Sequence, residues 1–183
     1  MRPLVVLDIN GVLVHRSTMT NFNLRPYLDE CLDALFDLFD VAIFTSMTKK
    51  YGSLAVNQIF TGEQQEMLKF VWYRDRTSWD PEYGKIKTVK QHDTVKPLSY
   101  ILDSPTVNDK RQYDRFNVVM VDDSHRKMKI NTSDNYIIVE SYEGKDKEDE
   151  TLFLLPFLLQ ERFEMLEVER DRGIFEGMEF LTI

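Results

Sequence analysis

Cysteine is nearly absent from this chain of 183 residues, which contains Cys31 and no other. A single cysteine excludes an internal disulfide framework and a zinc site built on several cysteines. We therefore expect a reducing compartment, either the cytosol or the nucleus. Cys31 falls on the apolar face of a predicted helix, so we expect a buried and unreactive thiol.

Long apolar runs are also lacking. The longest run near the C-terminus, Leu152–Leu159, is eight residues long and contains Pro156, whereas a helix needs about 20 apolar residues to cross a bilayer. No segment has the pattern of a secretory signal. We expect no membrane partner. Because domains typically contain roughly 100–200 residues, we predict a single domain over residues 1–183.

Basic residues are in deficit, with 23 Lys and Arg against 31 Asp and Glu and a net charge of −8. A surface of that sign does not suit nonspecific binding to nucleic acid, so we expect no nucleic-acid partner. The stretch Arg74–Lys96 departs from this balance, because it holds six basic residues against four acidic ones. It is either an ordinary solvated loop or a surface for an acidic partner.

Short apolar runs alternate with amphipathic segments along the chain. Runs rich in Val, Ile and Phe without polar alternation are typical of strands buried on both faces of a parallel sheet. Strands alternating with helices predict an α/β fold, with a mainly parallel central sheet flanked by helices. The predicted strands are Leu4–Leu7, Val41–Phe44, Phe70–Tyr73, Val118–Val121 and Tyr136–Val139, and the predicted helices are Pro26–Phe39, Thr48–Phe60, Lys96–Leu102 and Thr151–Glu169.

Polar residues directly follow three of these strands. Asp8 follows the first strand, Thr45 and Ser46 follow the second, and Asp122 and Asp123 follow a later one. Ligands bind beyond the carboxyl ends of the strands in open α/β sheets, so we expect these residues to converge on one site. Carboxylates gathered with hydroxyls suit a hard cation such as Mg²⁺. A carboxylate can also attack a phosphoryl group and form an aspartyl-phosphate.

Short motifs occur along the chain in a definite order. They are Asp8–Leu13, Phe44–Ser46, Val95–Ser99 and Val121–Ser124, with further matches at Lys50–Tyr51 and Leu154–Leu158. Together they resemble the motifs of the haloacid dehalogenase superfamily, and in particular its small C-terminal-domain phosphatases, the branch related to the NLI-interacting factor. The resemblance implies a Rossmann-like fold in which a small insertion, here residues 74–95, replaces a large cap domain. Residues 171–183 lie beyond the resemblance and have no assigned role.

The resemblance implies a nucleophile and a metal site. Asp8 would be the nucleophile that forms an aspartyl-phosphate. Mg²⁺ would be held by Asp8, Asp122, Asp123 and the backbone carbonyl of Asn10. Small C-terminal-domain phosphatases often have Asn at the second position of the late pair, so Asp123 is a mild departure from the family pattern.

The resemblance also implies a phosphate-binding set. Thr45 and the backbone amide of Ser46 would orient the phosphoryl oxygens. Lys96 would be the lysine that stabilises the acyl phosphate. Lys90 is the competing assignment, because 26 residues separate Lys96 from Asp122, more than the family pattern leads us to expect.

Asn10 stands where the family has its second aspartate, the general acid and base. An amide can form hydrogen bonds but cannot transfer a proton at neutral pH, and general acid–base catalysis is worth about 10²–10⁴ in rate. Three explanations are open: a deliberate replacement that slows turnover, a naturally weak phosphatase, or a protein that kept phosphate recognition and lost catalysis.

The motifs therefore predict a Mg²⁺-dependent phosphomonoesterase. Its substrate would be phosphoserine or phosphothreonine in an extended protein segment, and the resemblance implies RNA polymerase II tail repeats. A phospho-binding scaffold protein on the same fold is the alternative. A signalling receiver domain also gathers acidic residues around Mg²⁺, but its acidic pair follows the first strand, whereas here the pair comes late. The sequence does not indicate an oligomeric state.

Overall fold

The computed structural model describes residues 2–90 and 93–179, with side chains described up to residue 173. A five-stranded sheet forms its centre, in the order β5-β4-β1-β8-β9, and neighbouring strands pair in parallel. The strands are β1 (Leu4–Leu7), β4 (Asp40–Phe44), β5 (Val71–Trp72), β8 (Val118–Asp122) and β9 (Tyr136–Ile138). The predicted α/β fold with a parallel sheet is confirmed, and every predicted strand is present.

Both faces of the sheet are covered, which explains why its central strands do not alternate in polarity. Every residue of β1 is buried. Val5 and Leu7 pack into one apolar cluster, and Leu4 and Val6 pack into a second cluster on the opposite face. The prediction of burial on both faces is wrong for β9, because this strand lies at the sheet edge and Ile138 is 38% exposed.

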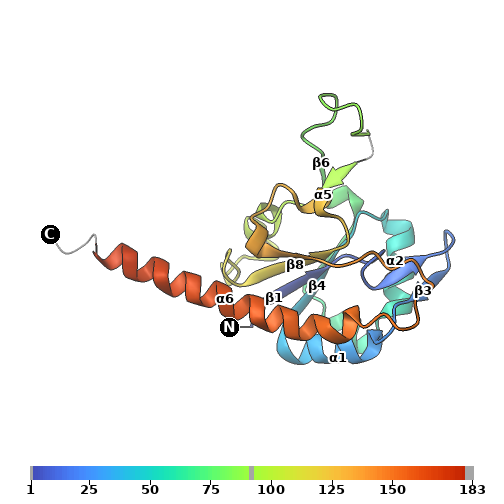
Figure 1. Cartoon of the computed structure of the whole chain (residues 1–183), viewed down its shortest axis with the longest axis horizontal. Coiled ribbons are helices and arrows are strands. Elements are labelled where there is room, and N and C mark those ends of the chain that lie inside the picture. Colours follow the sequence, from blue (N-terminus) through green and yellow to red (C-terminus); the bar gives the residue numbers. More distant parts are fainter. Residues whose placement is uncertain (1, 91–92, 180–183) are drawn as a thin grey trace.

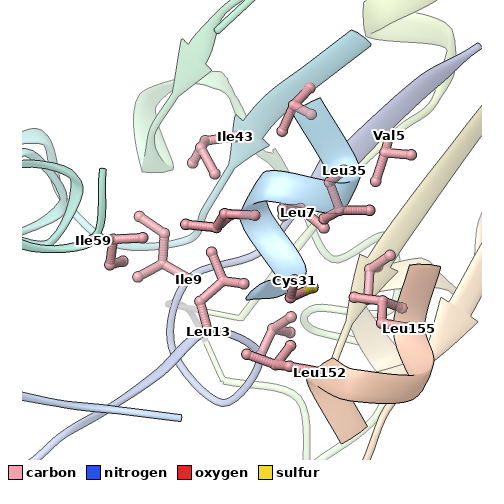
Figure 2. Packing of buried hydrophobic residues seen from close by; sticks show 14 of the residues in the cluster. Val5, Leu7, Ile9, Leu13, Cys31, Leu35, Ile43, Ile59, Leu152 and Leu155 are labelled. Atoms are coloured by element: carbon pink, nitrogen blue, oxygen red, sulfur yellow. The ribbon is translucent and has the colours of Figure 1, made fainter. Parts of the chain in front are cut away.

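Three long helices flank the sheet: α1 (Leu28–Leu38), α2 (Lys49–Ile59) and α6 (Thr151–Glu179). Helices α1 and α6 lie side by side along one face (Figure 1). Leu155 of α6 and Cys31 of α1 both belong to the apolar cluster under β1, as Figure 2 shows. Cys31 is buried and unpaired, as predicted, and burial raises the pKa of its thiol to about 12.

Shorter elements complete the chain. The predicted helix at 96–102 forms only as α4 (Ser99–Leu102), because Pro97 disfavours a helical conformation at the residue before it. The remaining elements are β2 (Val14–Arg16), β3 (Phe22–Leu24), α3 (Gly62–Met67), η1 (Arg74–Arg76), β6 (Ser78–Trp79), β7 (Thr94–Val95), α5 (His125–Met128) and η2 (Ser133–Asn135).

The predicted insertion at residues 74–95 contains η1 and the antiparallel pair of β6 and β7, and it stands above the sheet next to α5 (Figure 1). A buried carboxylate anchors it, since Asp80 lies 3.2 Å from Nε of Arg126 and 2.8 Å from Nζ of Lys129. Trp79 is 63% exposed, whereas Trp72 is buried in the core. The insertion is therefore tied to the short helix that follows the acidic pair.

Helix α6 continues past its predicted end at residue 169 and reaches Glu179. Residues 180–183 of the unassigned C-terminal segment lie outside the described residues, as do the side chains from residue 174 onward. Among the helices that the structure describes, none is both long enough and apolar enough to cross a membrane.

Candidate active site

The carboxyl ends of β4, β1 and β8 bring polar side chains together, because these strands are neighbours and run in parallel. Asp8, Thr45 and Asp122 are all buried at these ends. One carboxylate oxygen from each of Asp8, Asp122 and Asp123 lies within 4.8 Å of the other two. Residues separated by more than a hundred positions in the sequence thus form one acidic cluster.

A buried lysine lies against this cluster. Nζ of Lys96 is 3.1 Å from Oδ1 of Asp8 and 2.6 Å from Oδ2 of Asp122. Lys90, the competing assignment, lies exposed in the loop of the insertion. Of the two lysines, the structure therefore brings Lys96 to Asp8. Its role in stabilising a phosphorylated Asp8 stays a prediction.

The turn after β1 depends on a glycine. Gly11 has a φ of +89°, a conformation that residues with a Cβ adopt only at a cost. A Cβ at this position would lie 2.0 Å from Oδ2 of Asp123. The hydroxyl of Ser141 donates a hydrogen bond of 2.9 Å to the same oxygen. Gly11 thus leaves the space in which Asp123 and Ser141 meet.

Asn10, by contrast, is exposed at the mouth of the site. Its side-chain oxygen accepts a hydrogen bond of 2.8 Å from the backbone amide of Arg16. Asn10 lines the same pocket as Asp8, the predicted nucleophile. The position suits a group that exchanges protons with a substrate, although the amide itself cannot do so.

The pocket in front of Asp8 has a volume of about 410 Å³. Thr45 is buried at its floor, and its hydroxyl oxygen accepts a hydrogen bond of 3.3 Å from the amide of Met47. Nε of Arg74 donates to the carbonyl of Ser46 at 2.8 Å and thereby fixes the loop after β4. The residues that line the pocket are Asp8, Asn10, Arg16, Thr45, Ser46, Met47, Thr48, Tyr51, Arg74 and Lys127.

Lys127 is a residue in contact with the acidic cluster that the sequence analysis missed. Its Nζ lies 2.9 Å from Oδ2 of Asp8, 3.4 Å from Oδ1 of Asp122 and 3.5 Å from Oδ1 of Asp123. The available signal was its closeness in sequence to the acidic pair: the turn from β8 into α5 brings Lys127 within 3.5 Å of Asp123, four residues earlier.

The two lysines set the ionisation of the predicted nucleophile. Burial by itself raises the pKa of Asp8, but the ammonium groups of Lys96 and Lys127 outweigh burial and hold that pKa well below its usual range. Burial lowers the pKa of Lys127, yet the three carboxylates outweigh it and raise that pKa above its ordinary value. Asp8 is therefore an anion at neutral pH, as a nucleophile must be.

The acidic cluster fits a divalent cation bound by oxygen atoms. Oδ1 of Asp8 and Oδ1 of Asp123 are buried and have no well-formed hydrogen bond among the residues that the structure describes, and each lies near one ammonium group, that of Lys96 at 3.1 Å and that of Lys127 at 3.5 Å. Within this described part of the chain, three carboxylates face only these two ammonium groups, so the buried cluster keeps an excess negative charge, which is costly unless a further cation binds. Mg²⁺ prefers carboxylate oxygens and keeps several of its waters. Asp8, Asp122 and Asp123 thus offer a donor set of the kind predicted for this ion.

Comparison with protein families identifies the family to which the chain belongs. Residues 3–167 match the model of the NLI interacting factor-like phosphatases. The chain belongs to this family. The resemblance inferred from the motifs is confirmed, and membership sets aside the receiver-domain alternative.

One curated relative of this chain comes from Dictyostelium discoideum. The chain is similar to its CTD small phosphatase-like protein 2, with 26% identity over 174 residues. The match covers 84% of this chain and 26% of the relative. The chain thus spans about a quarter of the length of that protein.

Among solved structures, the chain is similar to Fcp1, an essential RNA polymerase II CTD phosphatase. The TM-score is 0.53 at 17% sequence identity, and the match covers 98% of this chain and 53% of the Fcp1 chain. At this identity the likeness establishes the fold. The predicted haloacid dehalogenase-type fold, with a central parallel sheet flanked by helices, is therefore confirmed.

Proposed function

We propose that the chain is a Mg²⁺-dependent phosphomonoesterase that acts on phosphoserine or phosphothreonine in an extended protein segment, in the cytosol or the nucleus. The observation that carries this proposal is the placement of Asp8. Its carboxylate is buried, lies between two ammonium groups and lines an open pocket. Family membership supports the same chemistry.

In the first step a carboxylate oxygen of Asp8 forms a bond to phosphorus while the bond from phosphorus to the substrate oxygen breaks. Thr45 and the amide of Ser46 orient the phosphoryl oxygens, and Lys96 compensates the charge on Asp8. Mg²⁺, held by Asp8, Asp122 and Asp123, would supply further neutralisation of phosphoryl charge. The departing alkoxide takes its proton from water, because Asn10 has none to give.

In the second step water attacks the phosphorus of the aspartyl-phosphate. The bond to Asp8 breaks, Asp8 returns to its carboxylate form, and inorganic phosphate leaves. The proton of the attacking water passes to solvent, since Asn10 cannot accept it. Both steps therefore proceed without a general acid or base at position 10. We expect turnover to be slower, by a factor of about 10²–10⁴, than in the same protein with aspartate at this position.

The pocket supports a phosphorylated protein as the substrate. The exposed side chains of Arg16 and Arg74 line it, so a chain with a net charge of −8 presents a cationic mouth at this point. A small insertion stands beside the site where a large cap would enclose a metabolite. Cations around an open groove suit a phosphate group within an extended, acidic segment, for which the RNA polymerase II tail is the first substrate to test.

Hydrolysis of an aryl phosphate, with and without Mg²⁺, tests the proposal. Three proteins are compared: the chain itself, Asn10→Asp, and the double variant Asn10→Asp with Asp8→Asn. We expect Asn10→Asp to raise the rate by about 10² or more, and the double variant to lose that gain. Folded but inert proteins in all three arms would contradict a phosphatase site.

A phospho-binding scaffold is the second candidate function, and Asn10 is the observation that favours it. Such a protein would bind a phosphopeptide through the cationic pocket without releasing phosphate. Measurable Mg²⁺-dependent release of phosphate from phosphopeptides by the unmodified chain would exclude this candidate.

A further inference from the structure

The ammonium group of Lys127 lies inside the acidic cluster rather than at its rim. It contacts one carboxylate oxygen of each of Asp8, Asp122 and Asp123, at 2.9, 3.4 and 3.5 Å. These are the three residues whose oxygens lie close enough together to hold a metal ion. The side chain thus occupies the position of a cation among the carboxylates that Mg²⁺ would use.

An ammonium group and a divalent cation would compete for these three carboxylates. Mg²⁺ binds oxygen at about 2.0–2.1 Å and demands near-octahedral geometry. Two cations on the same carboxylates would also repel each other strongly, because the site is buried and poorly screened. Lys96 does not compete in this way for all three residues, since its ion pairs are with Asp8 and Asp122, through the oxygen of each carboxylate that Lys127 does not contact.

The backbone around Lys127 is held in place, while its side chain has room to move. Its carbonyl accepts a hydrogen bond of 2.9 Å from the amide of Lys96. Its neighbours in sequence, Arg126 and Lys129, are both paired with Asp80 of the insertion. The Lys127 side chain itself is 24% exposed and lines the pocket in front of Asp8. Only the flexible four-carbon stem needs to turn for the ammonium group to leave the cluster.

We propose that Lys127 is a built-in competitor of the metal: its ammonium group must leave Asp8, Asp122 and Asp123 before Mg²⁺ binds, and it then contacts the substrate phosphate in the pocket. The inference rests on the metal site of the proposed function. Competition between Lys127 and the metal makes the binding of Mg²⁺ depend on the binding of phosphate. Phosphate draws Lys127 away from the carboxylates, so phosphate and Mg²⁺ each strengthen the binding of the other.

Calorimetric titration of Mg²⁺ into the chain and its Lys127→Met variant tests the proposal without any measurement of activity. We expect the variant to bind Mg²⁺ at least about tenfold more tightly, within the usual range of coupling between sites. Lys129→Met is the matched control, because it removes the same charge two residues away without touching the cluster; its Mg²⁺ affinity should stay within about twofold of the parent. Lys127→Arg keeps the charge and should keep the weak binding.

Inorganic phosphate provides the second arm. In the parent chain, saturating phosphate should tighten Mg²⁺ binding by about fivefold or more, and this coupling should shrink in Lys127→Met. Lys127→Gln, which is neutral but polar, replaces Lys127→Met if the methionine variant does not fold.

The outcomes separate the two proposals. Equal or weaker Mg²⁺ binding by the neutral variants, with binding by the parent intact, would overturn the role of Lys127 and leave the metal site standing. Failure of every protein to bind Mg²⁺ would overturn the metal site as well. Tighter binding by the neutral variants and not by Lys127→Arg or Lys129→Met would establish the competition.

Discussion

A single methyl group added at Gly11 should disturb the acidic cluster more than the fold. In Gly11→Ala the new Cβ would lie 2.0 Å from Oδ2 of Asp123 and 2.9 Å from Oγ of Ser141. The carboxylate is the end of a short side chain, so it would turn away rather than force the sheet apart. That movement breaks the hydrogen bond from Ser141 and withdraws one predicted ligand from the metal site.

Two contributions set the loss of stability in Gly11→Ala. A residue with a Cβ at positive φ costs about 1–2 kcal/mol. Loss of a hydrogen bond to a charged group costs about 1.5–3 kcal/mol more. We therefore expect the free energy of unfolding to fall by about 2.5–5 kcal/mol. We also expect Mg²⁺ affinity to fall by about tenfold or more, as when groups that position metal ligands are altered.

Gly84→Ala is the matched control for this experiment. Gly84 has a φ of +80°, close to that of Gly11, but a Cβ there would meet nothing within 4 Å. It should cost about 1–2 kcal/mol and leave Mg²⁺ affinity unchanged. Urea denaturation and calorimetric Mg²⁺ titration measure the two effects. Equal losses of stability in the two variants, with equal Mg²⁺ affinity, would refute the reasoning that Gly11 makes room for Asp123.

Two further predictions concern stability and are measured by urea denaturation. Leu155→Ala removes a fully buried side chain of α6 and should lower the free energy of unfolding by about 2–5 kcal/mol. Leu154→Ala is the control at a 46% exposed position and should change it by less than about 0.5 kcal/mol. Equal losses in the two variants would contradict the packing described. Burial raises the pKa of Asp149, but hydrogen bonds from Thr151 and Arg25 outweigh it and lower that pKa. Asp149→Asn removes the anionic partner of the buried Arg25 guanidinium and should therefore cost about 1.5–3 kcal/mol at pH 7. The difference from the parent should shrink as the pH falls below about 4 through the folded pKa. A constant difference would contradict the assignment.

The sheet could be predicted from the sequence because its central strands are buried on both faces. Leu4–Leu7 and Val118–Val121 are continuous apolar runs, and the structure buries every residue in them. Tyr136–Val139 has a similar composition but forms the edge strand β9. Composition alone does not distinguish an edge from a centre, since the neighbours of a strand come from distant parts of the chain.

The acidic cluster could be predicted for a related reason, because polar residues at the carboxyl ends of parallel strands must converge. The sequence assigns Lys96 as the active-site lysine, with Lys90 as the competitor. Which of the two lies against Asp8 depends on how the insertion folds, and no local sequence pattern specifies that. Lys127 was missed because a lysine beside His125 and Arg126 has the composition of an ordinary charged surface. The short helix α5 turns that residue inward while its neighbours pair with the insertion.

Detection of a phosphoryl group on Asp8 tests the central claim most directly. An aryl phosphate has a good leaving group, so the first step needs little help from a general acid, whereas hydrolysis of the aspartyl-phosphate lacks the base that Asn10 cannot provide. We therefore expect acid-quenched protein, incubated with aryl phosphate and Mg²⁺, to carry one phosphoryl group on Asp8 by mass spectrometry. Asn10→Asp should shorten its lifetime, and Asp8→Asn should abolish it. A phosphoryl group on another residue, or undiminished phosphorylation of Asp8→Asn, would contradict the assignment of Asp8 as the nucleophile.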